Sequence, residues 1–180
     1  MIILTLILLI AQSVCSKETP SLYDYIKTWK NQNGEEITLS KFKGTYVLIG
    51  MVYTGCAHAC PMTISKFQEI EKLLSGSNFR NFKFVLASFD IKKDTSKNLK
   101  AYMKKRKLDE LKWTFLSTDK ESTARELSLI LGISYKDLGN GDFSHSNVIT
   151  LLDPEGRIVH KIDNLNADIS EFKAAIQTSK

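Results

Sequence analysis

The sequence predicts an α/β domain: a central mixed β-sheet flanked by helices and extended by an N-terminal β-hairpin. Apolar runs of strand length, at residues 46–52 and 82–89, alternate with segments whose apolar residues recur at helical spacing. A chain of 180 residues with 43% hydrophobic residues can also bury one substantial core. We therefore expect a single domain over residues 20–180, preceded by a short leader.

The predicted elements follow one another in a regular order. They are a hairpin over Trp29–Leu39 turning at Asn33-Gly34, a strand Tyr46–Val52, a helix from Pro61 to about Gly76, a strand Phe82–Phe89, a helix Ser96–Lys107, a strand Trp113–Leu116, a helix Glu121–Leu131, a hairpin of Asn147–Leu152 and Arg157–Ile162, and a helix Asp168–Gln177. Alternating strands and helices that end in a hairpin and a helix are the thioredoxin-like order. Its crossover connections require helices on both faces of the sheet.

The leader precedes this domain. Its first fourteen residues contain no charged side chain, and the apolar run is shorter than the roughly 20 residues of an ordinary spanning helix. We expect a signal peptide or a short N-terminal membrane anchor over residues 1–16, with a lipid anchor on Cys15 as an alternative. The protein is then expected outside the cytoplasm, in the bacterial periplasm, either soluble or tethered to the membrane.

The net charge of +5 comes from lysines and arginines spread along the chain. The densest cluster, residues 104–107, lies at the predicted end of a helix, where cations are favoured by the helix dipole and solvated by water. We therefore expect a solvated surface there and no nucleic-acid partner.

Cys56 and Cys60 stand where a buried strand ends and a helix begins, in the segment Tyr53-Thr-Gly-Cys-Ala-His-Ala-Cys-Pro61. The N–H groups and the positive dipole end of a helix start stabilise a thiolate over a thiol. Pro61 suits the first helical turn, where its missing N–H has no intrahelical partner. The spacing of four can direct both sulfurs to one side of the loop, where they could close a disulfide or chelate a soft metal.

Two thiolates need a further ligand to complete a typical metal site, and His145 is the candidate. It precedes the strand Asn147–Leu152, which in a thioredoxin-like sheet starts beside the cysteine loop. Two cysteines and one imidazole suit copper, because Cu(I) favours thiolate and Cu(II) accepts nitrogen. Zinc could occupy the same ligands. We therefore predict Cys56, Cys60 and His145 as metal ligands, with copper as the cofactor.

Two other histidines and one methionine have separate expected roles. His58 lies between the cysteines, where it could tune the thiolates or be an ordinary exposed residue. His160 is expected to be structural, and Met62 is expected to pack at the helix start.

These motifs together resemble the Sco/SenC family of copper chaperones. The likeness runs through the following segments: the Asn33-Gly34 hairpin, the cysteine motif, Ala87-Ser-Phe-Asp90 with Asp94-Thr95, Ser144-His145, and Leu152-Asp-Pro-Glu-Gly156. The resemblance implies that Cys56, Cys60 and His145 bind copper. It also implies delivery of copper to, or reduction of the thiols of, the binuclear copper centre in subunit II of cytochrome c oxidase.

Three positions depart from the family pattern. Ala57 and Ile91 each replace a common proline, and Ser144 replaces the acidic residue that commonly precedes the histidine. The three ligands survive these changes. The departures concern the groups that orient His145 and the fit to a partner.

Three functions compete on the sequence. The leading hypothesis is a metallochaperone whose partners are the oxidase subunit and a periplasmic copper donor or thiol reductant, with disulfide formation preventing copper binding. An enzyme, a thiol-disulfide oxidoreductase using the redox-active pair, is the runner-up. Such enzymes usually carry CxxC and a cis-proline before the late strand, whereas Ser146 precedes that strand here. A copper or redox sensor is the third.

Overall fold

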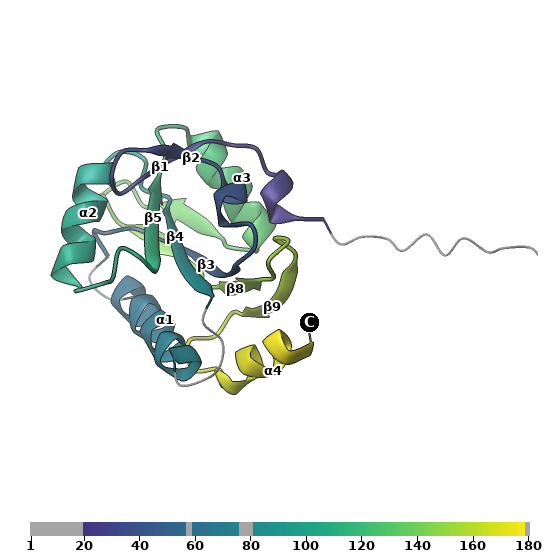
Figure 1. The fold of residues 1–180 in the computed structure, drawn as a ribbon. Helices are drawn as coiled ribbons and strands as arrows, with labels where there is room; N and C mark the ends of the chain where they lie inside the picture. The colour runs from purple at the N-terminus through teal and green to yellow at the C-terminus, as the bar shows by residue number, and fades with distance from the viewer. Residues whose placement is uncertain (1–19, 57–58, 76–80, 179–180) are drawn as a thin grey trace, which may run out of the picture.

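The computed structural model describes residues 20–56, 59–75 and 81–178, without the side chains of residues 59 and 60 (Figure 1). The strands are β1 (Trp29–Asn31), β2 (Glu36–Ile37), β3 (Tyr46–Val52), β4 (Phe82–Ser88), β5 (Trp113–Ser117), β6 (Tyr135–Asp137), β7 (Phe143–His145), β8 (Ile149–Leu152) and β9 (Ile158–Ile162). The helices are α1 (Ala59–Ser75), α2 (Ser96–Lys105), α3 (Glu121–Leu131) and α4 (Ser170–Thr178), with short 3-10 helices η1 (Leu22–Asp24) and η2 (Leu39–Phe42).

Seven strands form one mixed sheet in the order β2-β1-β5-β4-β3-β8-β9. The three central strands β3, β4 and β5 are parallel, and the strands on either side pair antiparallel. The continuous apolar runs of β3 and β4 are buried on both faces, as expected of parallel strands covered by helices. The predicted N-terminal hairpin is present and extends the sheet beyond β5.

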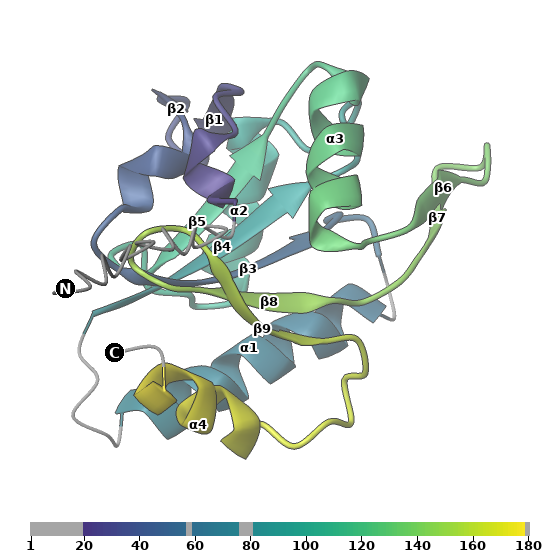
Figure 2. The same cartoon turned by 90° about the vertical axis from the view of Figure 1, so that its right-hand side faces the viewer.

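Helices cover both faces of this sheet. Figure 2 shows α1 and α4 on one face and α3 on the other. Phe67 of α1 packs its ring against Phe84 and Trp113, at centroid distances of 6.3 and 5.9 Å. The indole Nε1 of Trp113 also donates to Glu71 Oε2 of α1 at 3.1 Å. These contacts fix α1, the helix that contains Cys60, against the central strands.

The antiparallel pairing of β8 with β3 places the segment before β8 at the end of β3. Ile49 pairs with Thr150 and Val47 with Leu152, so residues 145–148 run beside the point where β3 leaves the sheet. Gly50 permits the close approach, because a Cβ there would lie 3.2 Å from the carbonyl oxygen of Val148. The expectation that this segment starts beside the cysteine loop is therefore confirmed.

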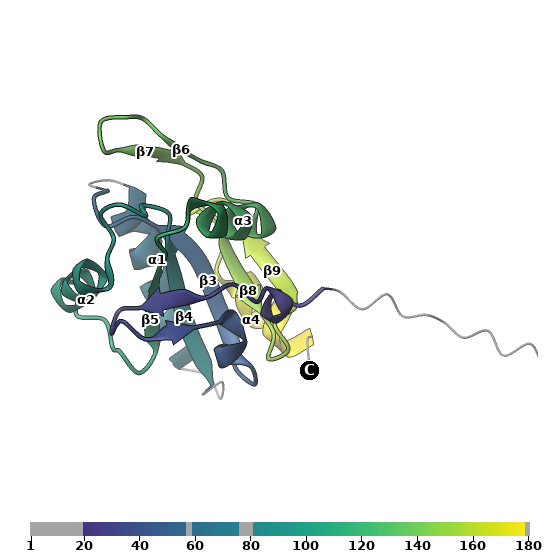
Figure 3. The same ribbon diagram turned by 90° about the horizontal axis from the view of Figure 1, so that it is seen from above.

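A further hairpin lies between α3 and β8. Residues 135–145 form the antiparallel pair β6–β7, in which Tyr135 pairs with His145, and Figures 2 and 3 show this hairpin projecting beyond the main sheet. Gly139 and Gly141 have φ values of 82° and 88° and supply the left-handed conformations of its turn. His145 is the last residue of β7.

Helix α1 also begins earlier than expected, at Ala59 rather than at Pro61. In the part of the chain that the structure describes, no helix combines the length and apolar character needed to cross a membrane. The predicted leader and Cys15 lie outside the described residues.

The central strand should dominate stability. Leu48 of β3 is fully buried between neighbours on β4 and β8, so Leu48→Ala is expected to lower the free energy of unfolding by about 2–5 kcal/mol. Leu111→Ala is the matched control, because Leu111 is 79% exposed and its truncation should cost no more than about 0.5 kcal/mol. Urea unfolding measures both, and similar losses for the two variants would contradict this packing.

Candidate metal and thiol site

The cysteine loop leaves the sheet at the end of β3. It turns at Tyr53, whose carbonyl oxygen accepts a hydrogen bond from Cys56 N at 3.4 Å. Cys56 is half-buried and packs against the core. Because α1 begins at Ala59, Cys60 is the second residue of the helix. Both cysteines therefore lie at or near a helix N-terminus, where a thiolate is electrostatically favoured.

A buried carboxylate anchors this loop. Asp94 is 2% exposed, and it accepts hydrogen bonds from Thr54 N at 2.9 Å, from the Thr54 hydroxyl, and from Ser88 Oγ at 2.6 Å. Burial raises the pKa of Asp94, and the hydrogen bonds from Ser88 and Thr54 act in the opposite direction. The loop is thereby fixed to the end of β4 and to the segment before α2.

Tyr53 joins the cysteine loop to the β6–β7 hairpin. Its hydroxyl oxygen accepts a hydrogen bond from Phe143 N at 3.4 Å. Its proton faces two acceptors, Asp142 Oδ1 at 3.4 Å and the side chain of Cys56. Burial raises the pKa of Tyr53 to about 12, with a smaller raising contribution from the hydrogen bond to Cys56. The phenol carries a single proton, which it can donate to either of these two acceptors.

His145 is a direct neighbour of the Tyr53 ring. The two rings meet edge-on at a centroid distance of 5.9 Å, and the His145 ring also lies 5.2 Å from that of Phe89. His145 Nδ1 is 3.2 Å from the carbonyl oxygen of Ser146. Since a carbonyl oxygen only accepts, this contact places a proton on Nδ1 of His145.

A second contact ties the histidine segment to the cysteine helix. The Thr63 hydroxyl, in the first turns of α1, donates to Asn147 Oδ1 at 3.0 Å. Asn147 lies two residues after His145, so the helix start and the histidine segment are held together directly. Their relative position does not depend on Tyr53 alone.

The structure brings Cys56 and His145 together around Tyr53 but does not describe the whole predicted ligand set. The side chain of Cys60 and all of His58 lie outside the described residues. Among the residues that are described, no three His, Cys, Asp or Glu side chains are close enough to hold a metal ion. The three-ligand site of Cys56, Cys60 and His145 therefore stays a prediction.

Two residues outside that set were also interpreted from the sequence. His160, expected to be structural, lies on β9 with its ring 4.9 Å from that of Phe172 and its Nε2 3.5 Å from Glu171 Oε2. The expected packing of Met62 was wrong, because its side chain is 57% exposed. Met62 lies on the outward side of the first turn of α1, whereas the next residue, Thr63, points inward.

Sequence reasoning assigned no role to Tyr53 or Asp94. Both stand in segments that it singled out, Tyr53 at the head of the cysteine motif and Asp94 four residues after Asp90. The sequence did carry a signal for Asp94, because it is an acidic residue shortly after a buried parallel strand. The carboxyl ends of neighbouring parallel strands meet at one edge of the sheet, so a side chain that follows one strand lies near the loop that follows its neighbour.

A mixed sheet with a cysteine pair at the junction of β3 and α1, and a histidine beside it at the end of the β6–β7 hairpin, defines a thioredoxin-like protein with a thiol centre. Comparison with known families is more specific: the family model described as SCO1/SenC matches residues 14–179. The chain belongs to the SCO1/SenC family.

Individual relatives agree with this assignment. A protein of Bacillus subtilis (strain 168), described as a SCO1 protein homolog, is 26% identical over 155 residues, covering 82% of this chain and 80% of its own. The structure of BsSco, described as a Sco-family cytochrome c oxidase assembly protein with a disulfide switch, has a TM-score of 0.75 at 22% identity over 91% of this chain and 96% of its own. Copper-bound ScoI of Arabidopsis thaliana has a TM-score of 0.73 at 18% identity over 84% and 93%. The predicted thioredoxin-like fold is thereby confirmed.

The raised pKa of Asp94 predicts a pH-dependent stability. The contribution of this carboxyl is fully present below its ordinary pKa of 3.8 and is lost as the pH rises through the higher folded-state value. The unfolding free energy of wild type minus that of Asp94→Asn should therefore fall as the pH rises above the ordinary pKa of 3.8 in urea titrations. Exposed Asp119→Asn is the control, and a difference for Asp94→Asn that rises with pH would contradict the assignment.

The hydroxyl of Tyr53 should protect the hairpin backbone. Tyr53→Phe keeps the ring but removes the acceptor of the Phe143 amide, so that amide should exchange its hydrogen about fivefold faster, as expected for a lost bond of about 1 kcal/mol. Hydrogen exchange followed by NMR measures this effect. Tyr25→Phe removes a hydroxyl that donates to the Thr123 carbonyl oxygen and should leave Phe143 unchanged. Equal exchange rates of the Phe143 amide in Tyr53→Phe and wild type would show that the Tyr53 hydroxyl does not protect this amide.

Proposed function

We propose that this protein is a copper metallochaperone in which Cys56, Cys60 and His145 bind the metal. The observation that carries the proposal is the meeting of Cys56 and His145 on Tyr53, where the cysteine loop enters α1. Cys60 follows four residues after Cys56 at the start of that helix. Membership of the SCO1/SenC family and the copper-bound structure of a relative support the same cargo.

The donor set suits copper in both oxidation states. Two thiolates favour Cu(I), and an imidazole nitrogen makes the set acceptable to Cu(II). The Tyr53 hydroxyl faces the side chain of Cys56, and the carbonyl oxygen of Ser146 lies 3.2 Å from His145 Nδ1. These neighbours hold the two donors in place before the metal arrives, which lowers the entropic cost of binding.

Thiol redox chemistry would then control loading. Thiol-disulfide exchange with a disulfide-bearing protein converts the Cys56 and Cys60 thiols to a disulfide, transferring two electrons and two protons to the partner's sulfurs. The disulfide offers no thiolate to copper. A dithiol reductant reverses the step, so only the reduced chain takes up the metal.

We infer that the recipient is the binuclear copper site of cytochrome c oxidase subunit II, to which the protein delivers copper or whose thiols it keeps reduced. The description of BsSco as an oxidase assembly protein supports this recipient. The apolar leader, with no charged side chain in its first fourteen residues, supports a place outside the cytoplasm, in the bacterial periplasm, with a copper donor or thiol reductant as a second partner.

A thiol-disulfide oxidoreductase is the second candidate function. The helix start that stabilises a thiolate for copper also prepares it for attack on a disulfide. The two functions differ in their need for His145, because the exchange reaction uses only the cysteines. Catalytic reduction of a disulfide substrate that survives His145→Ala, together with weak copper binding, would favour the enzyme.

Copper titration of the reduced chain under anaerobic conditions tests the proposed function. In competition with a Cu(I) chelator, Cys56→Ser, Cys60→Ser and His145→Ala should each lose about tenfold or more in affinity. His160→Ala is the matched histidine control and should bind copper as wild type does. Unchanged affinity in Cys56→Ser or His145→Ala would overturn the ligand assignment.

A further inference from the structure

The strand that ends in His145 belongs to a small sheet of its own. Strands β6 and β7 form a two-stranded sheet, separate from the seven-stranded one, with three residues in each strand. A two-stranded hairpin is marginally stable by itself in water, and Figures 2 and 3 show this one projecting beyond the main sheet. The position of His145 therefore depends on the contacts that hold the hairpin to the rest of the domain.

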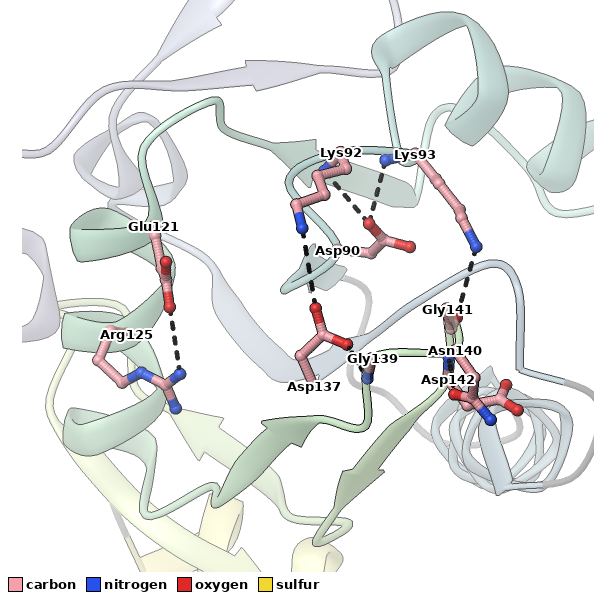
Figure 4. Close-up of polar contacts among 10 residues, drawn as sticks. All are labelled: Asp90, Lys92, Lys93, Glu121, Arg125, Asp137, Gly139, Asn140, Gly141 and Asp142. Atoms are coloured by element: carbon pink, nitrogen blue, oxygen red, sulfur yellow. Dashed lines mark hydrogen bonds and ion pairs between the residues drawn. The ribbon is translucent and has the colours of Figure 1, made fainter.

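Two lysines contact the hairpin at its turn. Lys92 Nζ lies 3.9 Å from Asp137 Oδ2, and Lys93 Nζ donates to the Gly141 carbonyl oxygen at 3.5 Å (Figure 4). Both contacts are longer than the roughly 2.7–3.2 Å typical of an N–H···O hydrogen bond. The Lys92 side chain is also 80% exposed, and exposed ion pairs contribute little because water and salt screen them. The end of the hairpin that bears His145 must therefore be fixed by other groups.

Tyr135 lies directly opposite His145 at that end of the hairpin. In the adjacent pair, Ser146 N donates to the Ser134 carbonyl oxygen at 2.9 Å. Hydrogen-bonded and non-hydrogen-bonded pairs alternate along antiparallel strands, so Tyr135 and His145 form a non-hydrogen-bonded pair, in which the side chains approach most closely. Tyr135 is buried, whereas His145 is half-buried. A fixed Tyr135 therefore restricts the residue that bears the imidazole.

Arg125 of α3 makes two contacts with Tyr135. Its guanidinium carbon lies 3.8 Å from the centre of the tyrosine ring, and its Nη1 donates to the Tyr135 carbonyl oxygen at 2.9 Å. A planar guanidinium that stacks on a ring and also binds the backbone of the same residue holds both the side chain and the strand. Arg125 itself pairs with Glu121 at 3.5 Å within α3 (Figure 4). The hairpin is thereby attached to a helix whose inner face is buried in the core.

Phe89 provides a second route from Tyr135 to His145. Its ring stacks on that of Tyr135 at a centroid distance of 4.8 Å, with the planes 14° apart, and lies 5.2 Å from the His145 ring. Phe89 is buried, and its N donates to the Val52 carbonyl oxygen at the end of β3 at 3.2 Å. A displacement of Tyr135 would therefore reach the imidazole through the strand pair and through this ring.

We propose that Arg125 is a positioning residue for the copper site: by fixing Tyr135, it holds His145 where the imidazole can join the cysteines on the metal. The consequence for copper affinity rests on the proposed function, whereas the placement of His145 by Arg125 is measurable in the metal-free chain. A ligand already in place needs less ordering when the metal binds, so affinity should depend on Arg125 although Arg125 is not a ligand.

NMR spectroscopy of the purified, reduced, metal-free full chain tests the placement. Arg125→Met keeps the length and the helix propensity of the side chain but removes the cation and the donor to Tyr135. The NOEs between the His145 and Phe89 rings should weaken. The Ser146 amide should exchange its hydrogen about fivefold faster, as expected when a hydrogen bond of the hairpin opens more readily. Wild-type NOEs and exchange in this variant would overturn the proposal.

A second arginine provides the matched control. Arg106, at the end of α2, also lies over a tyrosine ring, that of Tyr102 at 5.2 Å. Arg106→Met should therefore leave the NOEs of His145 unchanged, and an equal loss in this variant would contradict a specific role of Arg125. Arg125→Lys keeps the charge and an N–H donor without the planar stack. It should recover part of the NOE intensity, and it replaces Arg125→Met in the test should that variant fail to fold.

Copper titration against a Cu(I) chelator separates positioning from general stabilisation. Arg125→Met should lose about three- to tenfold in affinity when His145 is present. The same change in a His145→Ala background should cause no further loss, because the histidine that it positions is gone. Equal losses in both backgrounds would overturn the proposal. Unchanged affinity in His145→Ala alone would overturn the proposed function, whereas the NOEs of the metal-free chain would still support or refute the placement of His145.

Discussion

The contact of Tyr53 with both the cysteine loop and the β6–β7 hairpin is the constraint on which the site depends. Its hydroxyl contacts Cys56 and accepts a hydrogen bond from the Phe143 amide, and its ring and that of His145 meet edge-on. Residues about ninety positions apart in the chain thereby share one side chain. The phenol is a hydrogen-bond donor at physiological pH, and burial moves its pKa still further above that range, to about 12.

The rest of the fold holds Tyr53 in place. The parallel strands β3 and β4 direct their carboxyl ends to one edge of the sheet, where Asp94 binds Thr54 and so fixes the residue next to Tyr53. Antiparallel β8 brings the histidine segment back to the same edge, and Thr63 ties it to α1 through Asn147. The buried sheet thus supplies rigidity, and the loops at its edge supply the chemistry.

The elements that the sequence predicted correctly are those with strong local patterns. The runs around Leu48 and Phe84 are apolar over a full strand length, and Gly132 adopts the left-handed conformation that ends α3. The β6–β7 hairpin escaped prediction because each strand has three residues and no run of buried apolar positions. The roles of Tyr53 and Asp94 escaped because both depend on partners brought together only by the fold.

The cysteine pair could be recognised from the sequence, whereas the support around His145 could not. The central claim is that Cys56, Cys60 and His145 bind copper together. The X-ray absorption spectrum of the Cu(I)-loaded chain at the copper edge tests it most directly. It should show two sulfur neighbours and one imidazole nitrogen, and the nitrogen should disappear in His145→Ala. A copper ion with no sulfur neighbour, or a spectrum unchanged by His145→Ala, would contradict the claim.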